Sequence, residues 1–443
     1  MRRRSAGPAG RRVLSRVGLL LLTLLLTPAA AGCGGPDRPR PGPQRALPPT
    51  RPVIGIAYGD RLVWNSDADL GAALDTAVQV GATTVRADLS WDDVQHDGRG
   101  QYAWQGFDRV VTAAAARGLT VLPVLTGTPP WARSPGCAVP ACGPHDAAQF
   151  AAFAAAAAGR YAPRGVHDWE IWNEPNTAAF WSPAPDPVGY AATVRAAAAA
   201  LRHADRHAVV VLGGLASVTA KQGDLTATDF LAQVAAHGGT RVVDAVGYHP
   251  YSYPYLPSAS TSFGTAWEQI DRTRTSLRSV LTATGTPGLP IWITEVGAPT
   301  GGPGAASDGT PTDIGPDTTH VTEARQAQIA ADAVRTAAAD PGIGELIWYT
   351  DRDNAAATGG GSSGSTEDWY GLRRADGSAK PALDALRAAV AQLRAGASGQ
   401  AGATEQAGAT VQASVTVQAG ATVPAAAATT TGAGAQQAVS PAP

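Results

Sequence analysis

The sequence is poor in several residue types, and each shortage narrows what the protein can be. Its 443 residues include two lysines, and beyond residue 33 acidic residues outnumber basic ones 36 to 28. A chain with this charge balance has no basic surface to attract nucleic acid. Its apolar run from Val17 to Leu26 is too short to span a bilayer comfortably. Apolar residues still make up 44% of the chain, which is enough for a globular core.

Cysteine is scarce as well, with three in the whole chain. Cys137 and Cys142 lie close together in a segment rich in proline and glycine. In an exported protein two such cysteines predict a disulfide. His145 is the only nearby residue of a metal-binding type, and no second cluster of ligands accompanies it. We therefore expect neither a metal nor an organic cofactor.

The N-terminus has the order of a targeting segment. Six arginines precede the apolar run, and small residues from Pro28 lead to Cys33. Small residues directly before a cysteine resemble a bacterial lipoprotein signal, in which Cys33 would be lipidated and become the new N-terminus. Ala30 stands where leucine is usual, so ordinary secretion is the alternative, and Arg11-Arg12 leaves twin-arginine export open. We expect an exported protein, anchored to the cell membrane or released.

Two low-complexity segments flank the central part of the chain. Residues 34–52 are rich in proline and predict an extended spacer. Residues 396–443 repeat a six-residue unit, have no aromatic side chain to bury, and predict a disordered tail. Residues 1–33 would be the signal peptide, which leaves residues 53–395 as a single folded domain.

Within residues 53–395, short apolar strands alternate with alanine-rich helices. Eight strands can be counted, and this alternation predicts an α/β fold, a (β/α)8 barrel. The expected strands are 53–58, 84–89, 120–125, the first half of 168–176, 208–212, 242–251, 291–297 and 346–351. The expected helices include 67–80, 146–159, 188–203, 228–237, 267–282, 321–339 and 381–394.

Two of these strands end in a glutamate. Glu174 is followed by Pro175, which cannot continue a strand, and Glu295 is followed by Gly297. In a (β/α)8 barrel the carboxyl ends of the strands carry the catalytic residues. Two carboxylates facing one cavity are what hydrolysis of a glycosidic bond requires. The alternative is that each glutamate is a solvated strand terminus.

The sequences around both glutamates resemble known catalytic strands. Residues 172–175 (Trp-Asn-Glu-Pro) and 293–297 (Ile-Thr-Glu-Val-Gly) resemble the acid/base and nucleophile strands of clan A glycoside hydrolases, most like family 39 and also like family 5. The resemblance implies that Glu174 is the general acid/base and Glu295 the nucleophile of a retaining glycosidase. It further implies a separation of about 5–5.5 Å between the carboxyl groups. Asn173 would donate a hydrogen bond to the sugar 2-hydroxyl.

The same resemblance assigns binding roles to residues on other strands. Arg86 would orient the nucleophile, although pairing with Asp88 or Asp92 is an alternative. His249 and Tyr251 match a His-x-Tyr motif on the sixth strand, where the tyrosine contacts the nucleophile and the histidine faces the sugar.

Two tryptophans complete the predicted site. The resemblance places Trp348 beneath the reacting sugar, with core packing as the alternative. Trp131 would line a leaving-group subsite or anchor a loop. The long loop over 298–319 is expected to shape the cleft.

The partner predicted by these residues is a carbohydrate, bound by a monomeric enzyme. The resemblance to family 39 suggests β-xylosides or an exopolysaccharide, and the resemblance to family 5 suggests β-glucans or mannans. The rival hypothesis is a surface lipoprotein that binds glycan in the same cleft without cutting it.

Overall fold

The computed structural model describes residues 51–354 and 365–396. The predicted signal peptide with Cys33, most of the proline-rich spacer and the repeat tail lie outside these residues. No helix within the described ranges has both the length and the apolar character needed to cross a membrane.

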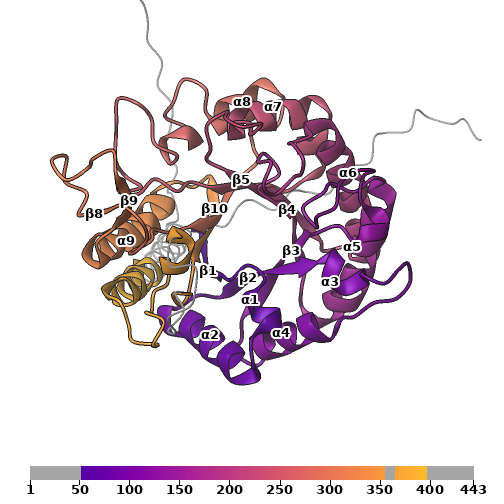
Figure 1. The fold of residues 1–443 in the computed structure, drawn as a ribbon, viewed down its shortest axis with the longest axis horizontal. Coiled ribbons are helices and arrows are strands. Elements are labelled where there is room, and N and C mark those ends of the chain that lie inside the picture. The colour runs from indigo at the N-terminus through magenta and orange to yellow at the C-terminus, as the bar shows by residue number, and fades with distance from the viewer. Residues whose placement is uncertain (1–50, 355–364, 397–443) are drawn as a thin grey trace, which may run out of the picture. The chain divides into compact units, whose positions relative to one another are not determined.

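Eight parallel strands close into a barrel in the order β1-β10-β7-β6-β5-β4-β3-β2, with helices around the outside (Figure 1). The predicted (β/α)8 fold is thereby confirmed. Because all eight strands run in the same direction, their carboxyl ends meet at one face of the barrel. The barrel strands are β1 (Val53–Ala57), β2 (Thr84–Ser90), β3 (Thr120–Thr126), β4 (Asp168–Asn173), β5 (Val209–Ala216), β6 (Ala245–His249), β7 (Ile291–Val296) and β10 (Ile343–Tyr349).

The loop after β7 contains the two remaining strands. β8 (Ala305–Ser307) and β9 (Thr318–Val321) pair with each other and not with the barrel. The loop predicted over 298–319 therefore has secondary structure of its own.

Helices connect successive barrel strands and cover the outer face of the sheet (Figure 1). One predicted helix, over 267–282, is wrong in its extent. A 3-10 turn at Glu268–Ile270 precedes the true helix, which starts after Ser276 because the Ser276 hydroxyl accepts a hydrogen bond from the backbone N–H of Ser279. The helices are α1 (Arg61–Trp64), α2 (Asp67–Val80), α3 (Trp91–Gln95), α4 (Gln105–Ala115), α5 (Ala147–Tyr161), α6 (Pro187–Ala204), α7 (Ala227–Ala236), α8 (Leu277–Ala283), α9 (Glu323–Ala339) and a last helix at 381–396.

The core has two layers, one on each side of the sheet. Inside the barrel, small and branched side chains form a compact cluster of Ala57, Leu122, Val211, Ala245 and Ile347. A larger cluster fills the space between the sheet and the helices. Side chains alternate between these layers along each strand. The interior is therefore a packed core, and only the carboxyl ends of the strands leave room for a site.

Candidate active site

The floor of the site is an ion pair inside the barrel between Arg86 on β2 and Glu170 on β4. Arg86 is 1% exposed and Glu170 is fully buried. The Arg86 Nε lies 2.6 Å from Glu170 Oε2, and Nη2 lies 3.2 Å from Oε1. The Gly214 backbone N–H and the Thr294 hydroxyl also donate to Glu170 Oε1, at 2.7 and 3.0 Å. Four hydrogen bonds thus compensate a carboxylate that has lost all its water.

Arg86 also contacts residues at the carboxyl ends of the strands, above Glu170. It donates to Glu295 Oε1 and, through Nη2, to the Asn173 Oδ1 at 2.8 Å. The alternative pairing of Arg86 with Asp88 or Asp92 is wrong, since none of the hydrogen bonds that Arg86 makes to described residues goes to them. Its hydrogen bond to Asn173 fixes the amide with Nδ2 as the remaining donor.

Glu295, near the end of β7, is held by donors on both oxygens. Arg86 donates to Oε1, and the Tyr251 hydroxyl donates to Oε2 at 2.7 Å. Burial by itself raises the pKa of Glu295. The positive charges of His249 and Arg86 and the hydrogen bonds from Tyr251 and Arg86 outweigh burial, so the pKa lies below its ordinary value. Glu295 is therefore an ionised carboxylate at neutral pH.

Glu174 stands just beyond the end of β4 in a left-handed backbone conformation, with φ of 45°. A non-glycine residue rarely adopts this conformation, and such residues concentrate at functional sites. The Glu174 N–H donates to the Gly214 carbonyl at 2.9 Å, which fixes the turn. Its carboxylate Oε1 lies 2.8 Å from His249 Nδ1.

His249 is fully buried, so the expectation that it faces the sugar is wrong. Its Nδ1 contacts Glu174, and its Nε2 lies 3.1 Å from the Thr294 hydroxyl. Space for the ring comes from Gly214, where a Cβ atom would lie 2.0 Å from His249 Nε2. Burial lowers the pKa of His249, but the charge of Glu295 and the hydrogen bond and charge of Glu174 outweigh it and raise the pKa.

These contacts bring the two predicted catalytic glutamates together. One oxygen from each of Glu174 and Glu295 and one nitrogen of His249 all lie within 4.8 Å of one another. Among the described residues they also form the one group placed to hold a metal ion. The same arrangement suits a pair of carboxylates acting on a single bond, with one of them ionised by its neighbours.

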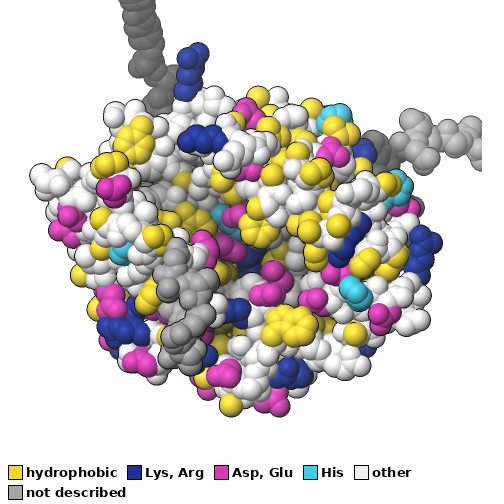
Figure 2. Space-filling model, viewed as in Figure 1, with side chains coloured by type: hydrophobic (Ala, Val, Ile, Leu, Met, Phe, Trp, Pro, Cys, Tyr) yellow, Lys and Arg dark blue, Asp and Glu magenta, His cyan; other side chains and the backbone are white. Residues whose placement is uncertain are grey.

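A cavity of about 1070 Å³ lies above the pair, at the carboxyl ends of the strands. Figure 2 shows the hollow near the middle of this face, with acidic side chains in and around it. No lysine or arginine lines it among the residues that the structure describes. Burial, together with the charges of Glu295 and Asp60, raises the pKa of Asp88 to about 7 despite the opposing charge of Arg86. The carboxylates that line the cavity are Asp60, Asp88, Asp92, Asp93, Glu174, Glu295 and Glu367.

The predicted sugar platform, Trp348, is wrong. Trp348 is 2% exposed, belongs to the core between sheet and helices, and does not line the cavity. Because side chains alternate along a strand, Ile347 and Tyr349 point to the other side of β10. Tyr349 lines the cavity, and so does Tyr370, whose ring lies 5.4 Å from that of Tyr349. Once Ile347 is assigned to the barrel interior, the alternation of side chains identifies Tyr349 as the residue of β10 that faces the cavity.

Trp131 anchors its loop. Its Nε1 donates to the Gln95 carbonyl at 2.8 Å, and its ring packs edge-on against Trp91 at 5.4 Å. It is not among the residues that line the cavity. Further along the same loop the sulfur atoms of Cys137 and Cys142 are bonded to each other.

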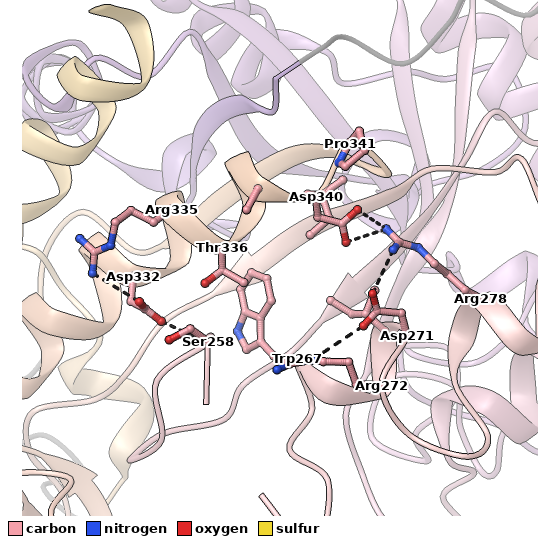
Figure 3. Close-up of a pocket in the computed structure, with 13 residues that line it drawn as sticks. Ser258, Trp267, Asp271, Arg272, Arg278, Asp332, Arg335, Thr336, Asp340 and Pro341 are labelled. Carbon is pink, nitrogen blue, oxygen red and sulfur yellow. Dashed lines mark hydrogen bonds and ion pairs between the residues drawn. The ribbon is translucent and has the colours of Figure 1, made fainter. Parts of the chain in front are cut away.

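A second cavity, of about 570 Å³, lies in the outer helical layer (Figure 3). It shares no lining residue with the cavity above Glu174 and Glu295. Its charged groups are neutralised by each other: Arg278 donates to both oxygens of Asp340, and Arg335 pairs with Asp332. Trp267, which also lines it, is 2% exposed. This cavity has no unpaired acid or base for catalysis among the residues that line it.

Comparison with known proteins also indicates a glycoside hydrolase. The family model of Cellulase (glycosyl hydrolase family 5) matches residues 50–350. No curated protein sequence matches the chain.

Among solved structures, a family 39 glycoside hydrolase from Bacteroides cellulosilyticus WH2 is similar with a TM-score of 0.54 and 22% identity over 77% of this chain. The chain spans 64% of that protein's length. A monomeric β-xylosidase from Caulobacter crescentus CB15 has a TM-score of 0.56 and 18% identity, covering 77% of this chain and 69% of its own. A GH5_18 protein from Streptomyces cattleya, in complex with GlcNAc, has a TM-score of 0.55 and 18% identity, covering 78% of this chain and 80% of its own. At these identities the likeness concerns the fold.

Removing the arginine at the floor of the site should destabilise the whole barrel. Arg86→Met leaves Glu170 buried without its counter-ion, and we expect a loss of about 3–5 kcal/mol in the free energy of unfolding. Urea denaturation measures the loss. Arg374→Met, which removes an exposed pairing with Glu323, is the control and should change stability little. Equal stabilities of Arg86→Met and the wild type would contradict the account of the floor.

Proposed function

Because this chain belongs to the cellulase family, glycosyl hydrolase family 5, we propose that it cleaves glycosidic bonds with retention of configuration by means of Glu174 and Glu295. Membership of the family makes it a glycosidase with a carbohydrate substrate. The main support for a retaining mechanism with Glu174 and Glu295 is that one oxygen of each carboxylate lies within 4.8 Å of the other, in unlike surroundings. A separation this small suits a retaining enzyme, whose nucleophile attacks the sugar directly, better than an inverting one that must admit a water.

In the first step Glu295 attacks the anomeric carbon. The Glu295 carboxylate is held ionised by Arg86 and Tyr251, so it attacks as an anion and forms an ester to the sugar. Glu174 gives its proton to the oxygen of the leaving group as the glycosidic bond breaks. The Nδ2 of Asn173 is placed to donate to the sugar, since its Oδ1 is engaged by Arg86.

In the second step Glu174 accepts a proton from water, which attacks the ester and releases the sugar. His249 fixes the direction of the Glu174 carboxyl. The Thr294 hydroxyl donates to Glu170, so the Nε2–H of His249 donates to Thr294. The Nδ1 of neutral His249 is then an acceptor for a protonated Glu174, and protonated His249 is a donor to an ionised Glu174. The hydrogen bond between His249 and Glu174 therefore forms in both protonation states.

The charge of the cavity favours a neutral glycan. Seven carboxylates and, among the described lining residues, no lysine or arginine surround the substrate. A cleft of one sign repels ligands of the same sign. Xylans, glucans and mannans therefore suit it better than chains of uronic acids or sulfated sugars.

The chain is further proposed to act outside the cytoplasm, anchored to the membrane through a lipid at Cys33 or released after cleavage. The bonded Cys137 and Cys142 support this, because disulfides persist in oxidising compartments. The arginine-rich start and the small residues before Cys33 support it as well.

Loss of either glutamate should abolish most of the activity. We expect Glu174→Ala and Glu295→Ala each to lower kcat by at least about 10³-fold. Hydrolysis of aryl glycosides and of xylan, glucan and mannan measures this, and NMR of the first product reports the retained anomer. Glu367→Gln alters another carboxylate of the cavity and serves as the control, with activity within about tenfold of the wild type. A glutamate variant with near-native turnover would refute the roles, and a wild type that binds but never cleaves these glycans would favour a glycan-binding protein.

The pH profile should report the hydrogen bond from Tyr251. Tyr251→Phe removes a donor that lowers the pKa of Glu295, so that pKa rises and Glu295 becomes protonated at a higher pH. The acidic limb of kcat/KM should therefore move to higher pH, by about one unit. Tyr253→Phe, a change in the same cavity that does not touch Glu295, should leave the limb in place. An unmoved limb in Tyr251→Phe would contradict this role.

Mass spectrometry of the mature protein tests the proposed export. Expressed with its first 33 residues in a bacterial host, the chain should begin at a lipid-modified Cys33. Cys33→Ser should remain unmodified. An unmodified Cys33 in the wild type, or cleavage elsewhere, would contradict the lipid anchor.

A further inference from the structure

Trp64 is unlike the other tryptophans of the chain. Its residue surface is 68% exposed, while each of the other ten, all within the described residues, is buried or half-buried. An indole ring offers a large flat apolar surface, and leaving that surface in water forgoes the stabilisation that burial would give. The exposure of the Trp64 ring therefore suggests that it binds something.

The position of Trp64 connects it to the catalytic face. It ends α1, the short helix that directly follows β1 and therefore lies at the carboxyl ends of the strands. A small cavity of about 200 Å³ is lined by Trp64 and by Asp88, Ser90 and Asp93. The last three residues also line the cavity above Glu174 and Glu295. The two cavities therefore lie next to each other and share these three lining residues.

The ring is mounted on a rigid base. Arg61, at the start of α1, donates to Asp351 and to the Arg352 carbonyl, which ties the helix to the end of β10. Beyond Trp64, Arg109 on α4 donates to the Asn65 carbonyl at 2.8 Å. Because both ends of α1 are fixed, a ligand that stacks on Trp64 does not need to order the backbone beneath it.

We propose that Trp64 is the platform of an outer sugar subsite, which holds a neutral pyranose unit of the glycan next to the unit that reacts. The C–H face of a pyranose is apolar and would lie against the indole. Its hydroxyls would donate to Asp88, which lines both cavities and whose carboxylate makes no hydrogen bond to another described side chain. This inference rests on the proposed glycosidase function and deepens it, since it assigns oligosaccharides and polysaccharides, not single-sugar glycosides, as the substrates.

Substrates of different lengths distinguish the effect of this subsite from that of Glu174 and Glu295. The probes are p-nitrophenyl β-xyloside, β-glucoside and β-mannoside and the corresponding oligosaccharides of two to six units. In the wild type, kcat/KM should rise with chain length for the series that it cleaves. Trp64→Ala should lose about tenfold on the longer members and keep wild-type kcat/KM on the single-sugar glycoside. Trp64→Phe, which keeps a smaller aromatic face, should recover part of the loss.

Phe263→Ala is the matched control, because Phe263 is 65% exposed and lines neither cavity. It should leave kcat/KM unchanged at every length. Equal losses of Trp64→Ala at every length, or no loss at any, would overturn the subsite.

Binding provides an independent measurement. In the inactive Glu295→Ala background, calorimetric titration with the six-unit oligosaccharides should give an affinity that Trp64→Ala lowers about tenfold. Failure of the wild type to cleave any probe would contradict the proposed function. An affinity that Trp64→Ala does not change would contradict the subsite alone.

Discussion

The site depends on one buried guanidinium. Arg86 lies inside the barrel, where a lone charge would be strongly unfavourable, and it is retained because Glu170, Glu295 and Asn173 engage three of its nitrogens. These partners come from β4 and β7, so Arg86 on β2 links three strands that lie apart around the barrel. The site therefore requires the closed barrel, which brings these three strands around one guanidinium.

Three chemically identical side chains near Arg86 have different surroundings. Glu170 receives four donors and is sealed from solvent, so it cannot contact a substrate in the cavity. Glu295 shares the same arginine but opens to the cavity, so its charge is both stabilised and accessible. Among the described side chains, the Glu174 carboxyl makes a hydrogen bond to His249 alone, a group that can accept or donate a proton. The two carboxylates that open to the cavity therefore have different partners, and those of Glu295 hold its pKa below the ordinary value.

Local pattern was sufficient to predict the barrel and that Glu174 and Glu295 lie close together at one end of it. Strand ends, the turn residues after Glu174 and the resemblance of residues 172–175 and 293–297 to known motifs are all visible along the chain. Glu170 was missed although it stands four residues before Glu174, because its partners Arg86 and Thr294 lie far away in sequence. Contacts between distant strands leave no local signature in a single sequence.

The errors at His249 and Trp348 have a different origin. Both residues belong to the right strands, but Trp348 lies on the outer side of β10, whereas His249 is on the barrel side of β6 and is buried below the cavity. Trp348 points to the helices because Ile347 occupies the barrel interior. His249 lies beneath the cavity because Gly214 has no side chain and leaves room for its ring. A glycine on one strand thus sets the position of a histidine on the next.

The abundance of tryptophan in the chain says little about sugar binding, since most of these rings are structural. Trp91, Trp169 and Trp172 are buried in the core around the barrel. What distinguishes Trp64 is that its exposed ring lines a small cavity next to the one above Glu174 and Glu295. Binding energy gained at a distance from the reacting bond accelerates the reaction when it holds the substrate in the geometry of the transition state. A fixed aromatic surface beside the cavity can supply such energy only to a chain long enough to reach it, so the length of the glycan becomes part of the recognition of the bond that is cut.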